Sequence, residues 1–378
     1  MKNDSSPGPD GFGPAFFKFF WNLVNPSLVT LFEEFYENAA DLQRINKSHI
    51  VLLPKKVGVT KPDQFRPISL QSCPLKLIAK VLTTRLQPLV PQLVHPDQTG
   101  FIKGRSISEN FIYAAEIVQT CYKRRILIAL KLDFRKAFDS IEWSALDLVL
   151  DAKNFPSKWR DWIRNILTTG QTAVLLKWIN CKKGLRQGGP LSPYLFILVA
   201  DVLQQLLSSA AADGTFQHPI TPNSPCPVLQ YADDTLIILK ADEAQLLALK
   251  ETLQDFSAAT GLHINFEKST FLPICVDPDL ARHLATIFDC PVSSFPQPYL
   301  GLPLSTTKLC TKDFQPMIAA TDKYLAGWKG NLLNDMGRTI LVTSVLASTP
   351  RVPYELPFAL QRDSRESRSK TAFLPLDW

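Results

Sequence analysis

An apolar segment that ends in an aspartate constrains the fold of this chain more than any other sequence feature. Residues 126–132 carry isoleucine and leucine on both faces, as a central strand covered on both sides would, and Asp133 follows directly. Residues 228–240 have the pattern of a β-hairpin with Asp233 and Asp234 at its tip. The sequence therefore predicts carboxylates held at the ends of rigid strands.

Carboxylates in this arrangement suit divalent cations. Enzymes that transfer a nucleotide to a hydroxyl use two metal ions about 3.5–4 Å apart, and Mg²⁺ prefers oxygen ligands such as carboxylates, phosphates and water. Each aspartate also has a structural interpretation, because Asp-Asp is common in hairpin turns and Asp133 could simply end its strand. Asp139, three residues before Glu142, resembles a capping box, so we assign it to helix capping and not to metal binding.

Helical and extended patterns alternate around these strands, which predicts an α/β or α+β core with helical lobes. Start and stop signals support the boundaries, for example Ser72 before Pro74, and Gly261 after residue 260. The expected helices are 14–24, 27–39, 72–88, 108–122, 144–152, 156–168, 242–260, 312–329 and 334–347, and the Gly/Pro-rich stretch 184–193 is expected to open a further long helix that runs to about residue 212. Further strands are expected at 49–53, 172–176 and 178–181.

Composition narrows the class of protein. A net charge of +6, from 41 basic and 35 acidic residues, is compatible with a nucleic-acid partner without requiring one. The seven cysteines contain no CxxC pair, which disfavours a zinc knuckle or a disulfide framework and fits a reducing intracellular setting. Residues 1–13 are unlike a signal peptide, and the apolar run 195–200 ends at Asp201, too soon to span a bilayer.

Several sequence blocks resemble those of one protein family. Residues 231–234, YADD, resemble the corresponding box of reverse transcriptases, and residues 132–139, LDFRKAFD, resemble the first catalytic box of the non-LTR (LINE-type) retrotransposon enzymes. Residues 184–193, GLRQGGPLSP, resemble the box between them. Further matching blocks, in the family's order, are 7–12, 54–56, 65–70, 97–101, 104–106 and 299–301. The resemblance extends over about residues 5–360 and is closest to plant LINE elements.

The resemblance implies an α+β right-hand polymerase fold. Fingers are expected over 1–124, a palm with an antiparallel sheet flanked by helices over 125–305, and a partial helical thumb over 306–360. Residues 361–378 match nothing in the family and are expected to form a disordered tail.

The resemblance also implies RNA-directed DNA polymerase activity, in which a primer 3′-hydroxyl takes a nucleotide from a dNTP opposite an RNA template. It assigns two Mg²⁺ ions, with Mn²⁺ as a substitute, to Asp133, Asp233 and Asp234. The expected partners are an RNA template, a DNA primer and dNTP, with no membrane, in the nucleus or cytoplasm.

Residues around the carboxylates receive roles from the same resemblance. Phe138 matches the steric gate, an aromatic ring placed where a ribose 2′-hydroxyl would lie, with a core aromatic before a helix as the alternative. Lys55 and Arg66 resemble residues that grip the triphosphate, for which a point charge and a planar fork are suited. Solvated surface charge is the alternative for both, and Lys56 could replace Lys55.

Other matched residues lie nearer the reacting groups. Gln187 resembles the residue that touches the incoming nucleotide, and Gly188 would let the backbone approach it closely, although the same stretch is also a helix entry capped by Ser192. Lys268 falls where the family has a lysine proposed to protonate the leaving pyrophosphate, with a surface lysine as the alternative. Thumb residues that could follow the template–primer backbone or simply pack in the core are Trp328, Lys329 and Arg338.

Departures from the family's pattern leave a second interpretation open. Gly189 stands where the family usually has Asp, and the hairpin within 172–181 is short and lacks the Gly or Asn of a tight turn. The endonuclease domain and the later C-terminal segments are also expected to be missing. A catalytically inactive remnant that folds and binds RNA is therefore the alternative function. A group II intron maturase and a viral RNA polymerase fit less well, because no RNA-binding domain follows the thumb and Phe138 would obstruct a ribonucleotide.

Overall fold

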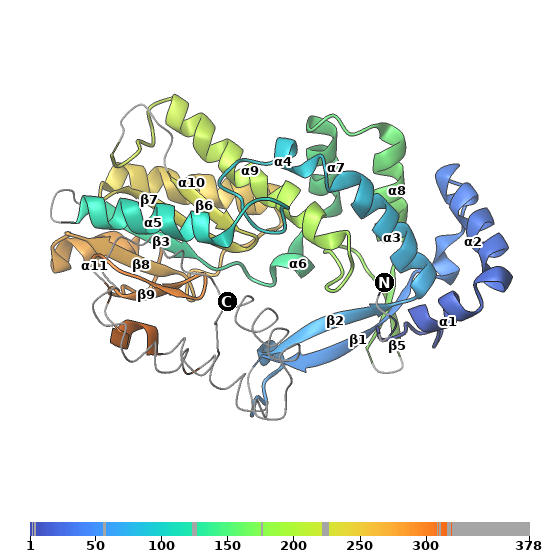
Figure 1. Cartoon of the computed structure of the whole chain (residues 1–378). Coiled ribbons are helices and arrows are strands. Elements are labelled where there is room, and N and C mark those ends of the chain that lie inside the picture. Colours follow the sequence, from blue (N-terminus) through green and yellow to red (C-terminus); the bar gives the residue numbers. More distant parts are fainter. Residues whose placement is uncertain are drawn as a thin grey trace, which may run out of the picture. The chain divides into compact units, whose positions relative to one another are not determined.

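The computed structural model describes residues 1–319 except 2, 4, 56–57, 123–126, 175–176, 221–226, 308, 310 and 316–318 (Figure 1). The chain forms two compact units that are interleaved along the sequence. Unit 1 comprises residues 1–103, 133–210 and 248–265, and unit 2 comprises residues 104–132, 211–247 and 266–378. Each unit contains its own four-stranded sheet, and each is described by itself.

Unit 1 is built on a sheet with the strand order β2-β1-β4-β5. β1 (Lys47–Pro54) pairs antiparallel with β2 (Phe65–Gln71) and parallel with β4 (Gln171–Val174). β4 in turn pairs antiparallel with β5 (Lys177–Asn180). The parallel pairing of β1 with β4 requires a crossover connection, so this sheet joins segments that are distant in the sequence.

Helices pack around this sheet in unit 1. They are α1 (Pro14–Phe19), α2 (Trp21–Tyr36), α3 (Cys73–Leu86), α4 (Val90–Leu93), α6 (Ala137–Ser140), α7 (Trp143–Ala152), α8 (Ser157–Thr168) and α9 (Ser192–Ala212), with 3₁₀ turns η1 (Leu42–Arg44) and η2 (Pro62–Gln64). α9 is the most deeply buried of these helices, because every residue from Leu195 to Ala200 is at most 3% exposed.

Unit 2 contains an antiparallel sheet in the order β6-β7-β3-β8. Its strands are β6 (Val228–Tyr231), β7 (Asp234–Lys240), β3 (Leu127–Leu132) and β8 (Thr270–Ile274). A separate two-stranded ribbon joins β9 (Gln297–Tyr299) to β10 (Leu302–Leu304). The helices are α5 (Ile107–Cys121), α11 (Pro278–Thr286) and α10 (Glu243–Thr260), which continues into unit 1, with the 3₁₀ turn η3 (Thr311–Phe314).

The core of unit 2 explains why β3 is central. Apolar residues of α5 and alternate residues of β3, β7 and β8 form one buried cluster, which includes Val118, Ala129 and Ile238. The intervening residues of β3, such as Ile128 and Leu130, are also fully buried. β3 is therefore covered on both faces, as its isoleucine- and leucine-rich sequence predicts.

Most expected elements are confirmed, and two N-terminal boundaries are wrong. The expected helices 14–24 and 27–39 are instead divided at Phe20, and Pro26 lies inside α2. Proline removes a single backbone donor, here in the second turn of a helix that buries Leu28 and Phe35. Tertiary packing therefore outweighs the local break. The expected helix 334–347 and most of the expected helix 312–329 lie outside the described residues, and the described start of the latter is the 3₁₀ turn η3.

The helix α9 is apolar along most of its length. By length and composition alone, α9 is apolar enough to cross a membrane, contrary to the expectation from its short apolar run. The core helices of soluble proteins can have the same length and composition. Asp201 within α9 is completely buried and pairs with Lys153, so the helix packs as a core element in unit 1.

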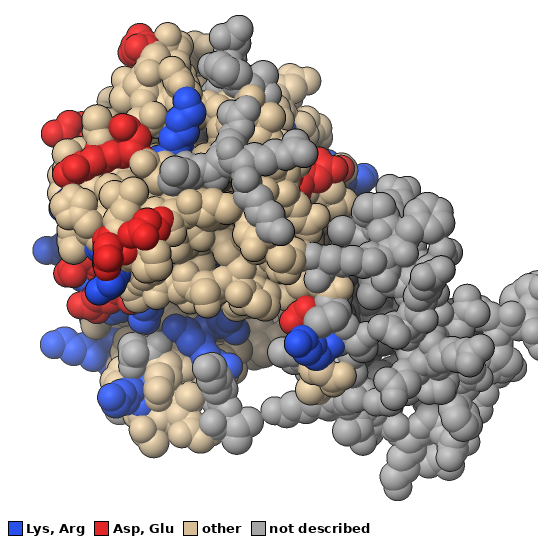
Figure 2. Space-filling view, turned by 90° about the vertical axis from the view of Figure 1, so that its left-hand side faces the viewer, with Lys and Arg blue, Asp and Glu red and all other residues tan. Residues whose placement is uncertain are grey.

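Charge is distributed unevenly on the surface. Figure 2 shows a face on which a group of Lys and Arg side chains lies in the lower part and most of the Asp and Glu side chains lie above it. The net charge of +6 therefore does not predict the charge of any one surface, and only local groups of basic residues can indicate a nucleic-acid partner.

Candidate active site

Asp133 extends directly from the central strand of unit 2. Its side chain is exposed, while Leu132 before it is buried. The Asp133 carbonyl accepts a hydrogen bond of 2.7 Å from the backbone N–H of Asn265. The neighbouring Phe134 forms an isolated bridge with Ile264. The backbone on which this carboxylate stands is therefore fixed by hydrogen bonds.

The second pair of carboxylates lies at the tip of the β6–β7 hairpin. Tyr231 pairs with Asp234, so Ala232 and Asp233 form the turn between them. Ala232 is buried and has a left-handed φ of 57°, which costs an L-residue about 1–2 kcal/mol. Asp233 and Asp234 are exposed. A strained non-glycine turn that presents two carboxylates to solvent is typical of functional sites.

The sheet register relates the two carboxylate-bearing segments. Leu132, the last residue of β3, pairs with Thr235 of β7. The residues adjacent to this pair in the chain are Asp133 and Asp234. Among the described residues, no group of three or more His, Cys, Asp or Glu side chains is preassembled to hold a metal ion.

The stretch 184–189 is held in place within unit 1. Backbone hydrogen bonds join Gly184 to Ile141 and Leu185 to Phe138, at 2.7 and 2.6 Å. Gly184 has a φ of 80°, and a Cβ there would lie 2.5 Å from the carbonyl oxygen of Asp139. Glycine is required for this close approach of two main chains.

Gln187 and Gly188 lie against β2. The backbone N–H of Ser69 donates a hydrogen bond of 2.9 Å to the Gln187 carbonyl. Gly188 has a φ of 95°, and a Cβ there would meet the Ile68 side chain at 3.2 Å. The structure therefore brings Gln187 and Gly188 against the strand that carries Arg66, whose side chain is exposed.

Phe138 and Asp139 lie on the short helix α6. The Phe138 ring is half-buried and stacks on Phe196, with ring centroids 4.8 Å apart and an interplanar angle of 17°. The expected capping role of Asp139 is wrong, because Asp139 lies inside α6 and the residue that precedes α7 is Glu142. A capping box does occur elsewhere, at Ser106 and Glu109 of α5. The spacing of three residues is the same for Asp139 and Glu142 as for Ser106 and Glu109, so the spacing alone does not predict which pair forms a capping box.

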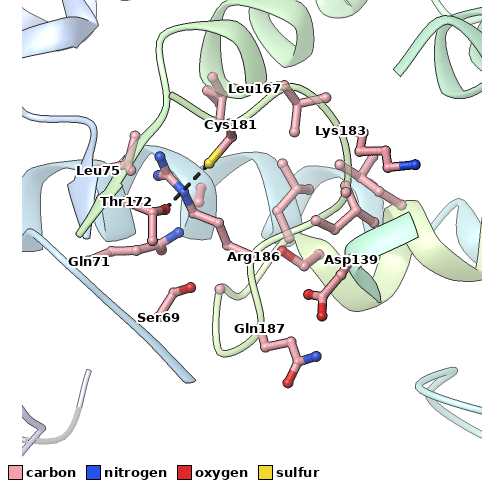
Figure 3. Close-up of a pocket in the computed structure, with 18 of the residues that line it drawn as sticks. Ser69, Gln71, Leu75, Asp139, Leu167, Thr172, Cys181, Lys183, Arg186 and Gln187 are labelled. Carbon is pink, nitrogen blue, oxygen red and sulfur yellow. Dashed lines mark hydrogen bonds between the residues drawn. The ribbon is translucent and has the colours of Figure 1, made fainter. Parts of the chain in front are cut away.

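A cavity of about 250 Å³ lies behind the 184–189 stretch in unit 1 (Figure 3). Asp139 and Gln187 are drawn together on one side of it, and Thr172 hydrogen-bonds to Cys181 across 3.4 Å. Desolvation of the Asp139 carboxyl raises its pKa, which nearby Lys136 opposes. The buried Gln71 side chain also lines the cavity, and its Oε1 has no hydrogen-bond partner among the residues that the structure describes.

Arg186 is a site-forming residue that sequence reasoning did not single out. Its guanidinium donates to the side chain of Asn46 and, at 3.1 Å, to the Asn46 carbonyl. Burial lowers its pKa, and the thiol of Cys181 opposes that shift. Asn46 and Arg186 are 140 residues apart, so no local sequence signal links them.

Two of the other expected site residues, Lys55 and Lys268, lie at the surface. Lys55 follows β1 and is exposed, and Lys268 is exposed in the turn before β8. The Ser72 hydroxyl does not cap α3 and instead donates to the Ile45 carbonyl. The remaining candidates, Lys56, Trp328, Lys329 and Arg338, lie outside the described residues.

Comparison with known proteins identifies the family. The family model described as reverse transcriptase (RNA-dependent DNA polymerase) matches residues 53–304, two thirds of the chain. The chain therefore belongs to the reverse transcriptase family. The matched region contains β3, the β6–β7 hairpin and the 184–189 stretch.

Relatives of the chain identify the group within the family. It is 27% identical to the transposon TX1 uncharacterized 149 kDa protein of Xenopus laevis, over 92% of this chain and 27% of the relative. It is 28% identical to the Pol polyprotein of the type-1 retrotransposable element R2 of Nasonia vitripennis, over 66% of this chain and 24% of the relative. For the element R2DM of Drosophila melanogaster the identity is 28%, over 70% of this chain and 24% of the relative.

The chain thus belongs to the reverse transcriptase family, and these relatives group it with the proteins of non-LTR retrotransposons, as its motifs indicate. It spans about a quarter of the length of these curated relatives.

Proposed function

We propose that this chain copies RNA into DNA, transferring nucleotides from dNTPs to a primer 3′-hydroxyl. The observation that carries the proposal is the register of β3 with β7, in which Leu132 pairs with Thr235 and the adjoining residues are Asp133 and Asp234. Membership of the reverse transcriptase family supports the same activity.

Asp133, Asp233 and Asp234 are the residues that would hold two Mg²⁺ ions. Three exposed carboxylates fit a hard cation that keeps water and substrate phosphates among its ligands, so a preassembled all-protein cluster is not required. When bound, the ions supply charge neutralisation at the primer hydroxyl and at the triphosphate. The contribution of the chain is rigidity, because the strands on which these residues stand are paired residue by residue.

The nucleotide end of the reaction is assigned to β2 and the 184–189 stretch. The hydrogen bond between Ser69 and Gln187 keeps Gln187 beside the strand that carries Arg66, whose fork suits a triphosphate. Phe138 is supported as the sugar gate by its stacking on Phe196, which fixes the orientation of the ring. Lys55 and Lys268 remain predictions for the triphosphate and for the leaving pyrophosphate.

The right-hand subdivision is part of the same proposal. The mixture of helices with mainly antiparallel sheets is consistent with it, and the family implies it. Fingers over 1–124 and a palm over 125–305 would each draw on both compact units, since the units are interleaved along the chain. The thumb over 306–360 falls almost entirely outside the described residues.

The test is primer extension on poly(rA)/oligo(dT) with Mg²⁺ and dTTP. The wild type is expected to extend the primer, and Asp233→Ala is expected to abolish extension. Asp255→Ala, at an exposed position of α10, is the matched control and should extend like the wild type. No extension by a wild-type chain whose circular dichroism shows it folded would overturn the proposal in favour of an inactive remnant. Extension that survives in Asp233→Ala would overturn the metal assignment.

A further inference from the structure

Arg186 is a largely desolvated cation beside Gln187, the residue that we assign to the nucleotide. Its guanidinium donates a hydrogen bond to the side-chain oxygen of Asn46 and another, at 3.1 Å, to the Asn46 carbonyl. Burial lowers the pKa of Arg186, the Cys181 thiol opposes that shift, and no carboxylate of the described part of the chain contributes to it. A charge removed from water is costly unless polar groups compensate for it. The two oxygens of Asn46 therefore hold the guanidinium in one orientation.

Asn46 joins Arg186 to two other elements of unit 1. Asn46 is completely buried, and its amide Nδ2 donates to the Ile166 carbonyl and to the Thr169 hydroxyl, both at 2.7 Å. The Asn46 carbonyl also accepts from the backbone N–H of Gln171 at 3.0 Å, at the start of the parallel pairing of β1 with β4. A single asparagine thus connects the end of α8 and the start of β4 to the guanidinium.

The space for the guanidinium depends on a glycine. A Cβ at Gly170 would clash with the guanidinium of Arg186, which its bonds to Asn46 keep from moving aside. Thr169 and Gln171, on either side of Gly170, both bond to Asn46. Three consecutive residues therefore contact one or other member of the Asn46–Arg186 pair.

Arg186 and Gln187 extend to opposite sides of the 184–189 stretch. Figure 3 shows the Arg186 side chain reaching toward Thr172 and the Gln187 side chain pointing away from it. The Gln187 carbonyl accepts a hydrogen bond of 2.9 Å from the backbone N–H of Ser69 on β2. Because an anchored side chain restricts the main chain of the next residue, the bonds of Arg186 to Asn46 also fix the backbone of Gln187.

We propose that Asn46 and Arg186 are positioning residues for nucleotide binding, which keep Gln187 against β2 and facing the incoming dNTP. Neither residue has to touch the nucleotide, because both act through the main chain of Gln187. The pair holds no reacting group, so it affects the affinity for dNTP and not the chemical step. The inference rests on the proposed function and adds to it the residues that hold the nucleotide site in place.

The first test is steady-state primer extension on poly(rA)/oligo(dT), from which KM and kcat for dTTP are obtained. Asn46→Leu removes the side-chain acceptor of Arg186 and should raise KM about tenfold with kcat nearly unchanged, the effect of one misplaced hydrogen bond to a charged substrate. Asn46→Asp is the conservative variant, because it keeps an oxygen for Arg186 and loses only the amide that donates to α8. Its KM should stay near the wild-type value.

Two further variants separate positioning from stability. Arg186→Lys should raise KM like Asn46→Leu, because an ammonium group does not reproduce the planar fork that reaches both oxygens of Asn46. Ile163→Val is the matched control, since Ile163 is buried on the same helix α8 and has no contact of this kind with the pair. It should lower the urea midpoint and leave KM unchanged.

A second readout requires no activity. Hydrogen exchange of the Ser69 amide reports directly on its bond to the Gln187 carbonyl. Asn46→Leu and Arg186→Lys are expected to remove protection at Ser69 and to leave the amides of β3 in unit 2 protected, whereas Ile163→Val should keep protection at both places.

Each outcome decides between positioning and a merely structural role. An unchanged KM for dTTP in both Asn46→Leu and Arg186→Lys would overturn the inference. An equal rise of KM in Asn46→Leu, Asn46→Asp and Ile163→Val would also overturn it, because KM would then follow stability. A wild-type chain that extends no primer would refute the proposed function, and the Ser69 amide would still decide the inference: loss of protection in Arg186→Lys supports it, and unchanged protection refutes it.

Discussion

Replacement of Lys153 by methionine should destabilise the protein strongly, because it would leave a buried charge without its partner. Asp201 is completely buried in α9 and accepts hydrogen bonds from Lys153 Nζ at 2.7 Å and from the backbone N–H of His95 at 2.7 Å. The Gln205 amide adds a longer contact of 3.4 Å. Lys153 also donates to the carbonyl of Leu93 at 2.5 Å, so the ion pair connects α7, the segment after α4, and α9.

The magnitude follows from what remains after the change. Breaking a buried ion pair by removing one partner costs about 3–5 kcal/mol, because the other charge stays desolvated. Asp201 in Lys153→Met keeps the His95 N–H, so we expect the lower end of that range, about 3 kcal/mol. The double variant Lys153→Met with Asp201→Leu removes both charges and should recover part of the loss, since an apolar pair replaces a buried ion pair at little cost while the His95 N–H loses its acceptor in Asp201.

Urea unfolding at pH 7, followed by circular dichroism, measures these differences. We expect the lowest midpoint for Lys153→Met and a midpoint between that value and the wild-type value for the double variant. A loss below about 1 kcal/mol in Lys153→Met would refute it, since exposed ion pairs account for that much. A double variant as unstable as the single one would show that packing, and not an uncompensated charge, is responsible.

Two further predictions concern unit 1. Gly189→Asp should stabilise the protein by about 0.3–1 kcal/mol relative to Gly189→Ala in urea unfolding, because it places a carboxylate near the N-terminal end of α9. Gly189 lies three residues before α9, and a Cβ there would lie 3.2 Å from Ser192 Oγ and 3.5 Å from the Gln71 amide. An aspartate variant less stable than the alanine variant would contradict this. The side-chain hydrogen bonds from Arg160 are the main cause of the lowered pKa of Asp147. This carboxylate therefore stabilises the folded state at pH values above its ordinary pKa of 3.8. That stabilisation is lost as the pH falls through the lowered pKa that the group has in the folded state. Asp147→Asn should therefore lower the urea midpoint at pH 7 and leave it unchanged near pH 2, and an equal loss at both values would refute the assignment.

Sequence periodicity and local chemistry were sufficient for the elements that carry the carboxylates. The unbroken apolar run before Asp133 predicts a strand buried on both faces, and β3 is such a strand. The hairpin at Asp233 and Asp234 and the end of α10 at Gly261, with its φ of 78°, were likewise predicted from local signals. These features depend on residues close together in the sequence, for which the period and the turn residues are decisive.

Local signals failed where packing competes with them. Pro26 and Ser72 both look like boundary residues, yet Pro26 is inside α2 and the Ser72 hydroxyl bonds to the Ile45 carbonyl and not to its own helix. Asp139 has the spacing of a capping residue but lies within α6, where burial raises the pKa of its carboxyl. A helix cap such as Ser72 is worth only about 1 kcal/mol, so a contact distant in the sequence can replace it. An interior proline costs about 3 kcal/mol, and the burial of Leu28 and Phe35 offsets that cost in α2.

The sequence by itself therefore determined the family, the catalytic carboxylates as candidates, and the strands on which they stand. Only the tertiary structure placed Arg186 against Asn46 and Trp178 beside His49, pairs that lie on segments far apart in the chain. The contact of Trp178 with His49 follows from the pairing of β1 with β4 and of β4 with β5. No local pattern specifies such a pairing, because the entropy cost of closing the long connection is offset by the packing of the whole unit.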